Sequence, residues 1–100
     1  MSDLQCSILC SPDVEENLLD RLLLTFPESV FTSTPTFGHG IADGTMSANE
    51  RVMGRVRILL VQIILPSPQW ETLRGILARD FGCSGIRFWV APISDAGVLA

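Results

Sequence analysis

The residues best suited to chemistry in this chain are a histidine between two glycines and a small set of arginines. Gly38-His39-Gly40 holds the only histidine of the sequence, at a place where the backbone can approach a ligand closely because glycine has no side chain. A neutral imidazole can coordinate a metal ion, and it titrates near neutral pH. The segment therefore predicts either a ligand or metal site at His39 or a turn with an exposed polar residue.

The arginines offer a second kind of chemistry, because a guanidinium can hold a carboxylate or a phosphate through two parallel hydrogen bonds. Arg55 and Arg57 fall on one face of a predicted strand, and Arg87 lies in another. Together they predict either an anion site or a solvated face with salt bridges to Glu50 or Asp80. No segment combines a nucleophile, a base and an oxyanion site, so we predict that the protein is not an enzyme.

The three cysteines give a weaker signal. Three residues separate Cys6 from Cys10, and both thiols fall on the core face of the first predicted strand. A buried cysteine usually acts as a small hydrophobic residue, so we predict reduced structural thiols and no metal or redox pair. Cys83 lies in a predicted turn and has no evident partner.

The elements that must position these residues follow from the apolar pattern. Alternation predicts strands over residues 4–10, 30–37, 52–65 and 86–93. Ser11-Pro12 and Ser67-Pro68 each read as an N-cap and first helical residue, and each precedes apolar residues at helical spacing. Pro35 suggests that the second strand lies at an edge or bends. The apolar stripe of the first helix is expected to include Leu18, Leu22 and Leu23.

The order strand-helix-strand-strand-helix-strand predicts one α+β domain over residues 1–100. Its fold is a ferredoxin-like βαββαβ sandwich, with an antiparallel four-stranded sheet and two helices on one face. Residues 38–51 lack an apolar pattern and read as a loop. The third strand is apolar on both faces, so one row must point away from the helices. We expect that row, and the aromatic Trp89, to pack against other subunits.

Composition excludes several classes of partner. The net charge is −4, and all seven basic residues are arginine, so we expect neither nucleic-acid binding nor a polybasic membrane patch. No apolar run is long enough to insert in a membrane. The first residues lack the basic and apolar segments of a secretory signal. We therefore expect a cytoplasmic protein.

Three blocks of sequence resemble the PII signalling superfamily. Thr36-Phe37-Gly38-His39-Gly40 is similar to the start of the PII T-loop, and the segment from Cys83 to Val90 is similar to the PII phosphate-binding loop and last strand. The closer likeness is to a small uncharacterised bacterial PII-like family, often encoded beside heavy-metal efflux transporters of the RND type. The residues that carry this likeness are His39-Gly40, Ser47-x-x-Glu50-x-Val52-x-Gly54-Arg55 and Trp89-Val90-x-Pro92-Ile93.

This resemblance implies a homotrimer with inward-facing sheets, a T-loop-like loop over residues 38–51, and ligand clefts between subunits. The lysine of the PII phosphate loop is absent, and Ile86 and Arg87 lie in its place. We therefore do not expect ATP or ADP binding to be inherited. The loop has no tyrosine, so the uridylylation known in PII proteins is not expected either.

The leading hypothesis is a non-enzymatic regulatory protein that senses a small ligand or a divalent metal and acts on a protein target. The target would be a membrane transporter for metal efflux. We expect His39 to sense the ligand or metal, Arg55 and Arg87 to bind an anion, and Glu50 to bind the ligand or anchor the loop. The full set of candidate ligand-binding residues is Gly38, His39, Gly40, Glu50, Arg55, Arg87 and Trp89.

Two alternatives belong to other classes. The first is a carrier or buffer for divalent or soft metals, resembling the divalent-ion-tolerance trimers. The second is an acylphosphatase-type enzyme on the same fold. Ser11-Pro12-Asp13 follows the first strand, where such an enzyme has a glycine-rich anion loop with arginine, and this counts against the enzyme.

Overall fold

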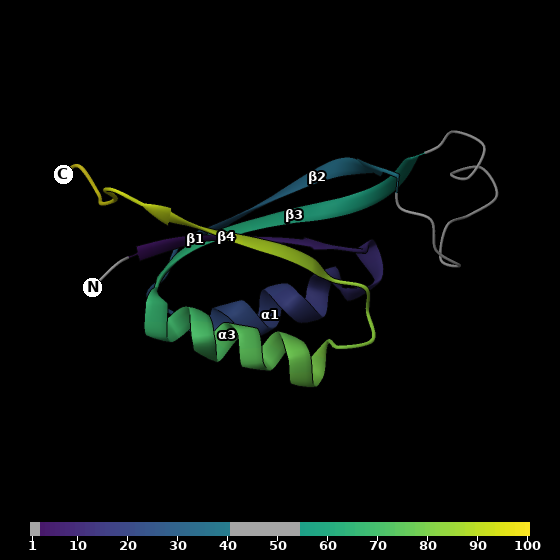
Figure 1. Cartoon of the computed structure of the whole chain (residues 1–100), viewed down its shortest axis with the longest axis horizontal. Helices are drawn as coiled ribbons and strands as arrows, with labels where there is room; N and C mark the ends of the chain where they lie inside the picture. The colour runs from purple at the N-terminus through teal and green to yellow at the C-terminus, as the bar shows by residue number, and fades with distance from the viewer. Residues whose placement is uncertain (1–2, 41–54) are drawn as a thin grey trace.

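The computed structural model describes residues 3–40 and 55–100. It confirms the predicted order of strands and helices (Figure 1). Along the chain the elements are β1 (Asp3–Cys10), the short 3-10 helix η1 (Pro12–Val14), α1 (Glu15–Thr25), β2 (Phe31–His39), β3 (Arg55–Pro66), α3 (Ser67–Asp80) and β4 (Arg87–Ile93).

The strands form one antiparallel sheet in the order β2-β3-β1-β4. Both long helices lie on the same side of it (Figure 1), which confirms the ferredoxin-like fold. The outer positions of β2 and β4 confirm that Pro35 lies in an edge strand, where its missing N–H costs no inner ladder bond. No helix formed by residues 3–40 or 55–100 has the length and apolar character of a membrane-spanning segment.

The core lies between the sheet and the helices. Alternate residues of the central strands point into it, and so do the apolar stripes of α1 and α3. Its buried members are Cys6, Ile8, Cys10, Leu18, Leu22, Phe26, Leu59, Val61, Ile63, Leu65, Trp70, Leu73 and Leu77. The prediction that Leu23 joins this core was wrong, since Leu23 is 59% exposed. It follows Leu22 by one position and therefore points about 100° away around the helix.

The other face of the sheet has no helix over it in the described chain (Figure 1). Ile58, Leu60 and Ile64 alternate with the buried row of β3, and Ile64 is 44% exposed. On β4, Trp89 has the same parity and is 50% exposed. We call this surface the open face. It is the apolar second face that the sequence predicted for the third strand.

Both helix starts differ from prediction. The chain after β1 forms the 3-10 turn η1 before α1 begins at Glu15, so Ser11 does not cap α1, and its side chain makes no capping hydrogen bond. Instead, the Ser11 carbonyl accepts a hydrogen bond from the Val14 N–H at 3.2 Å. Ser67 is the first residue of α3, and its cap position is filled by Pro66. Serine-proline therefore marked the place of each helix correctly but not the capping contact.

The second strand is also longer than predicted. β2 continues through Gly38 and His39, which pair with Val56 and Arg55 of β3. The expectation that residues 38 and 39 lie in a loop is therefore wrong, since cross-strand pairing overrides the weak strand propensity of glycine. The rest of the predicted loop, from residue 41, and the start of the predicted third strand lie outside the described residues.

Candidate functional site

The candidate residues gather at one end of the sheet. β2 ends there at His39, β3 begins with Arg55, and the last residues of β1 pair with the start of β4. In the ladders, His39 is the register partner of Arg55, and Arg87 is the partner of Leu9. The antiparallel topology therefore brings residues 39 and 87 to the same end of the molecule, although 48 positions separate them.

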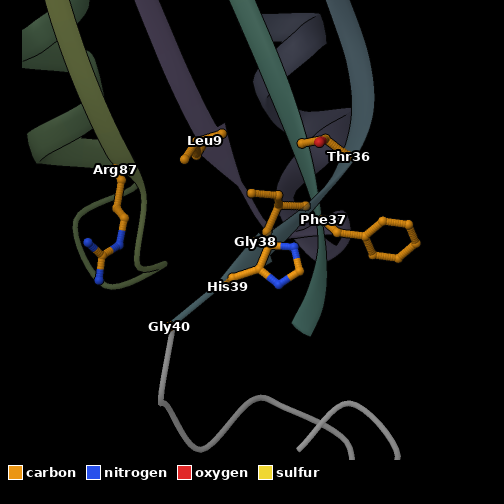
Figure 2. Close-up of a pocket in the computed structure, with 8 residues that line it drawn as sticks. Leu9, Thr36, Phe37, Gly38, His39, Gly40 and Arg87 are labelled. Atoms are coloured by element: carbon orange, nitrogen blue, oxygen red, sulfur yellow. The ribbon is translucent and has the colours of Figure 1, made fainter. Parts of the chain in front are cut away.

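A shallow depression of about 300 Å³ lies at this end. Four of its lining residues are among those predicted from sequence, namely Gly38, His39, Gly40 and Arg87. The others are Leu9, Thr36, Phe37 and Ile58. Figure 2 shows His39 and Arg87 reaching this end from different strands, whereas the ring of Phe37 points away from the others.

The lining combines an apolar floor with a few polar groups. Leu9 and Ile58 are half-buried, whereas His39 and Arg87 are exposed. The guanidinium is a permanent cation, and the imidazole can donate a hydrogen bond in either protonation state. Among residues 3–40 and 55–100, no carboxylate lines the depression. This chemistry suits a small anion with an apolar part.

The glycines on either side of His39 serve different purposes. Gly38 is buried within β2. Gly40 follows the strand with φ at +75°, a conformation that side chains disfavour. An ideal Cβ on Gly40 would meet nothing within 4 Å, so backbone conformation alone requires glycine there.

Arg55 and Arg57 lie apart from the depression. Arg55 lies over the ring of Phe37, with its Cζ 4.4 Å from the ring centroid. Arg57 lines a second depression on the helix side, of about 380 Å³, together with Glu15 and Pro35. The prediction that Arg55 and Arg57 share one face holds, since both have the parity of the buried row of β3.

One alternative for the strand arginines was a set of salt bridges to Glu50 or Asp80, and for Asp80 this was wrong. Its carboxylate lies 2.6 Å from Arg21 and 3.4 Å from Arg79. The hydrogen bond from Arg21 lowers the pKa of Asp80. Asp80 ends α3, so the partners nearest to it are on the helices.

Trp89, another candidate, does not line the depression. Trp89 lies two residues beyond Arg87 on the open face and pairs with Ser7. The other β4 aromatic, Phe88, faces the helices, and its ring centroid lies 5.4 Å from that of Trp70. Glu50 falls outside the described residues.

The turn before β4 determines where Arg87 starts. The Phe81 carbonyl accepts hydrogen bonds from the Ser84 N–H, at 3.2 Å, and from the Ser84 hydroxyl, at 2.5 Å. Gly85 has φ at +72°. Gly82 leaves no room for a side chain, because an ideal Cβ would lie 2.6 Å from the Ala78 carbonyl oxygen. The sequence predicted this turn but not its contacts.

Metal ligands are sparse in the described part of the chain. Residues 3–40 and 55–100 contain no cluster of three or more histidine, cysteine or acidic side chains. Cys6 and Cys10 are buried, and burial raises the pKa of each thiol to about 11. Thiols that stay protonated are poor metal ligands, in agreement with the structural role predicted for them. Cys83 is exposed.

The sequence analysis did not predict that Leu9, Thr36 and Ile58 line the depression. Thr36 and Ile58 are cross-strand partners, and Leu9 is the partner of Arg87. Strand alternation placed Leu9 and Ile58 on the face away from the helices. The sequence does not give the pairing register of the strands, and this register brings Leu9 and Ile58 to the end of the sheet where His39 and Arg87 lie.

Comparison with known proteins agrees with this fold. The family model described as "Protein of unknown function (DUF3240)" matches residues 1–100. No curated protein matches the chain. A DUF3240 family protein from Shewanella baltica OS155 has a similar structure, with a TM-score of 0.78, 18% identity, and coverage of 100% of this chain and 99% of that chain.

Two other solved structures, one of them a PII-like protein, are similar in fold. CPII, a nitrogen regulatory PII-like protein from Thiomonas intermedia K12 bound to ADP, AMP and bicarbonate, has a TM-score of 0.74 at 13% identity, covering 99% of this chain and 98% of that chain. The periplasmic divalent cation tolerance protein CutA from Archaeoglobus fulgidus has a TM-score of 0.66 at 12% identity, covering 96% and 87%. At these identities the likeness concerns the fold, and it confirms the PII resemblance of the sequence at that level. With its full length matched by the family model, the chain belongs to the DUF3240 family.

Proposed function

We propose that this protein is a non-enzymatic, PII-like regulatory protein that binds a small anion between the end of β2 and the start of β4. The observation that carries this proposal is the joint presence of His39 and Arg87 in the lining of one depression, to which the described part of the chain contributes no carboxylate. His39 and Arg87 come from two separate strands and lie at the same depression because of the fold. An isolated arginine on a solvated surface would have no such polar neighbour.

The ligand class follows from the lining. Arg87 would pair with a carboxylate, bicarbonate or phosphate oxygen, and His39 would donate a second hydrogen bond. Leu9 and Ile58 would contact an apolar part of the ligand. CPII, a neighbour in fold, was solved with ADP, AMP and bicarbonate, so these molecules are suitable first probes. A nucleotide would have to bind without the lysine of the PII phosphate loop.

The open face supports a homotrimer. Trp89 and Ile64 are 50% and 44% exposed on it, and large apolar side chains of this kind favour burial against another protein surface. The PII resemblance implies that three copies meet through this face. The depression would then lie near the boundary between copies, as the ligand clefts of PII proteins do.

The target of regulation follows from the resemblance alone. We infer a cytoplasmic protein whose predicted loop after His39 contacts a protein partner, with a membrane transporter for metal efflux as the first candidate. Ligand binding beside Gly38 and Gly40 would act at the base of that loop. Glu50 would bind the ligand or anchor the loop.

A metal-binding carrier is the second candidate. The exposed imidazole of His39 at the edge of the depression favours it, as does the similarity in fold to a divalent cation tolerance protein. His39 would need further ligands from outside the described residues or from other copies, because a protein metal site usually has at least three.

A thermal-shift and calorimetry screen tests both candidates. The probes are ADP, AMP, bicarbonate, acetate, Zn²⁺, Cu⁺ and Mg²⁺, and a ligand of the folded state stabilises it by about 2.7 kcal/mol at a hundredfold excess over Kd. We expect an anion to raise the melting temperature clearly less in Arg87→Gln than in wild type. Arg74→Gln is the matched control, since Arg74 contacts Phe88 and does not line the depression.

The screen separates the hypotheses cleanly. A metal shift that His39→Ala abolishes and Arg87→Gln leaves intact would favour the carrier. Anion binding that survives both Arg87→Gln and His39→Ala would contradict the proposed site.

A further inference from the structure

Hydrogen bonds and core packing fix the segment between α3 and β4 along its length. The Phe81 N–H donates to the Leu77 carbonyl at 3.1 Å and closes the last turn of α3. The Phe81 carbonyl then accepts from Ser84, and Gly85 turns the chain into β4. Phe81 and Ile86 pack against the core from either end of this segment. The backbone therefore reaches Arg87 along one specified path.

The segment follows an acidic residue, Asp80, at a position where negative charge is unfavourable. Asp80 is the last residue of α3. The carbonyl end of a helix carries partial negative charge, so a carboxylate there is destabilising unless a cation offsets it. Two cations lie beside it, Arg79 from the same helix and Arg21 from α1.

Arg21 differs from Arg79 in what it connects. Its Nη1 lies 2.6 Å from Asp80 Oδ2, and its Cζ lies 6.0 Å from the ring centroid of Phe81. One side chain of α1 thus contacts both residues at the exit of α3. Arg79 precedes Asp80 in the chain, and its Nε lies 3.4 Å from Asp80 Oδ1. It therefore offsets the negative charge but does not connect α3 to another helix.

We propose that Arg21 is a positioning residue for Arg87, acting through Asp80 and Phe81 to hold the turn that delivers Arg87 to the depression. The effect on ligand binding rests on the proposed function. The effect on the turn does not, because it concerns the path of the backbone from Asp80 to Arg87. Removing Arg21 would remove this link between α1 and the exit of α3 and so widen the range of positions open to the Arg87 guanidinium.

The test compares Arg21→Gln with Arg79→Gln in the full chain. Each variant removes one arginine that contacts Asp80, and only the first removes the link between the helices. The seven arginines of the chain give few enough Nε–Hε signals for NMR to follow Arg87, which Arg87→Lys identifies. We expect Arg21→Gln to increase fast motion of the amides from Gly82 to Arg87 and of Arg87 Nε, and Arg79→Gln to leave both as in wild type.

Binding of ADP, bicarbonate and acetate is measured on the same samples. For the anion that binds wild type, we expect about a threefold loss of affinity in Arg21→Gln and none in Arg79→Gln. Equal changes in the two variants, or unchanged motion of residues 82–87 in Arg21→Gln, would overturn the positioning role. If motion rises in Arg21→Gln but Arg87→Gln binds anions like wild type, the positioning role stands and the proposed function fails.

Discussion

Arg55 makes a cation-π contact with Phe37, with 4.4 Å between the guanidinium carbon and the ring centroid. The ring of Phe37 points away from the other residues that line the depression (Figure 2). Arg55 and Arg87, paired as anion ligands in the sequence analysis, therefore occupy different surroundings. Such a contact contributes about 0.5–1 kcal/mol at an exposed site.

The two arginines should differ in their effect on anion binding. We expect Arg87→Gln to weaken binding of the best anion about tenfold, because a hydrogen bond to a charged group contributes about 1.5–3 kcal/mol. Arg55→Gln should change affinity by no more than about twofold while losing the stacking contact. Isothermal titration calorimetry measures both. Equal losses would mean that Arg55 reaches the ligand after all.

Two glycines of the α3 region should respond oppositely to alanine. Gly82→Ala places a Cβ 2.6 Å from the Ala78 carbonyl oxygen, so we expect a loss of about 1–3 kcal/mol in the free energy of unfolding. Gly75 lies inside α3 with nothing within 4 Å of its ideal Cβ, so Gly75→Ala should add about 0.5–1 kcal/mol. Urea unfolding measures both, and a neutral Gly82→Ala would show that the turn can shift.

Burial should separate two leucines of the helices. Leu73 is completely buried, whereas Leu24 is 80% exposed. Leu73→Ala should lower the free energy of unfolding by about 2–5 kcal/mol, since it leaves a cavity in the core. Leu24→Ala should stay within about 0.5 kcal/mol of wild type. A comparable loss at Leu24 would indicate that another surface covers it.

Stability should fall at alkaline pH because of the core cysteines. Their pKa is raised from 9.0 to about 11, so between these values the unfolded thiols lose protons that the folded thiols keep. The folded state then binds more protons, and stability decreases by about 1 kcal/mol per pH unit for each thiol. The chain has no tyrosine or lysine to titrate in this range.

The control for this pH effect is the variant Cys6→Ala/Cys10→Ala. Its free energy of unfolding should be lower than that of wild type at pH 8, because two core side chains are truncated. It should then change much less between pH 9 and pH 11. A parallel decline in wild type and variant would assign the pH dependence to other groups.

Charge on the open face should disturb self-association. Trp89→Glu places a carboxylate on the face we propose to be covered by other copies, so sedimentation equilibrium should show a smaller species than wild type. Leu24→Glu is the control, since Leu24 is exposed on α1, on the other side of the sheet. Identical masses for wild type and Trp89→Glu would place the interface elsewhere.

The fold could be predicted from sequence because its signals are local and repeated. Alternation in residues 4–10 and helical spacing after residue 67 each specify an element, and their order specifies the sandwich. The limits of elements were harder. Gly38 and His39 have little strand propensity, and their place in β2 depends on pairing with Val56 and Arg55.

Residue type selected four of the residues that line the depression, but the sequence did not show that they lie together. Gly38, His39, Gly40 and Arg87 were chosen by residue type, and they line one depression. Nothing local distinguishes Arg87 from Arg55, because the difference depends on their neighbours in the fold: Arg87 pairs with Leu9 beside the depression, whereas Arg55 lies over the Phe37 ring. The pairing of Asp80 with Arg21 was missed for a similar reason, since 59 positions separate them.

The chain enters and leaves at the end of the sheet opposite to His39 and Arg87. Asp3, at the start of β1, is the register partner of Ile93, at the end of β4, and Figure 1 shows both termini on that side. A fluorophore, a purification tag or a surface tether joined to the tail after Ile93 would therefore lie about 20 Å from Arg87, at 3.4 Å per strand residue. Immobilised copies would present the depression to the solution.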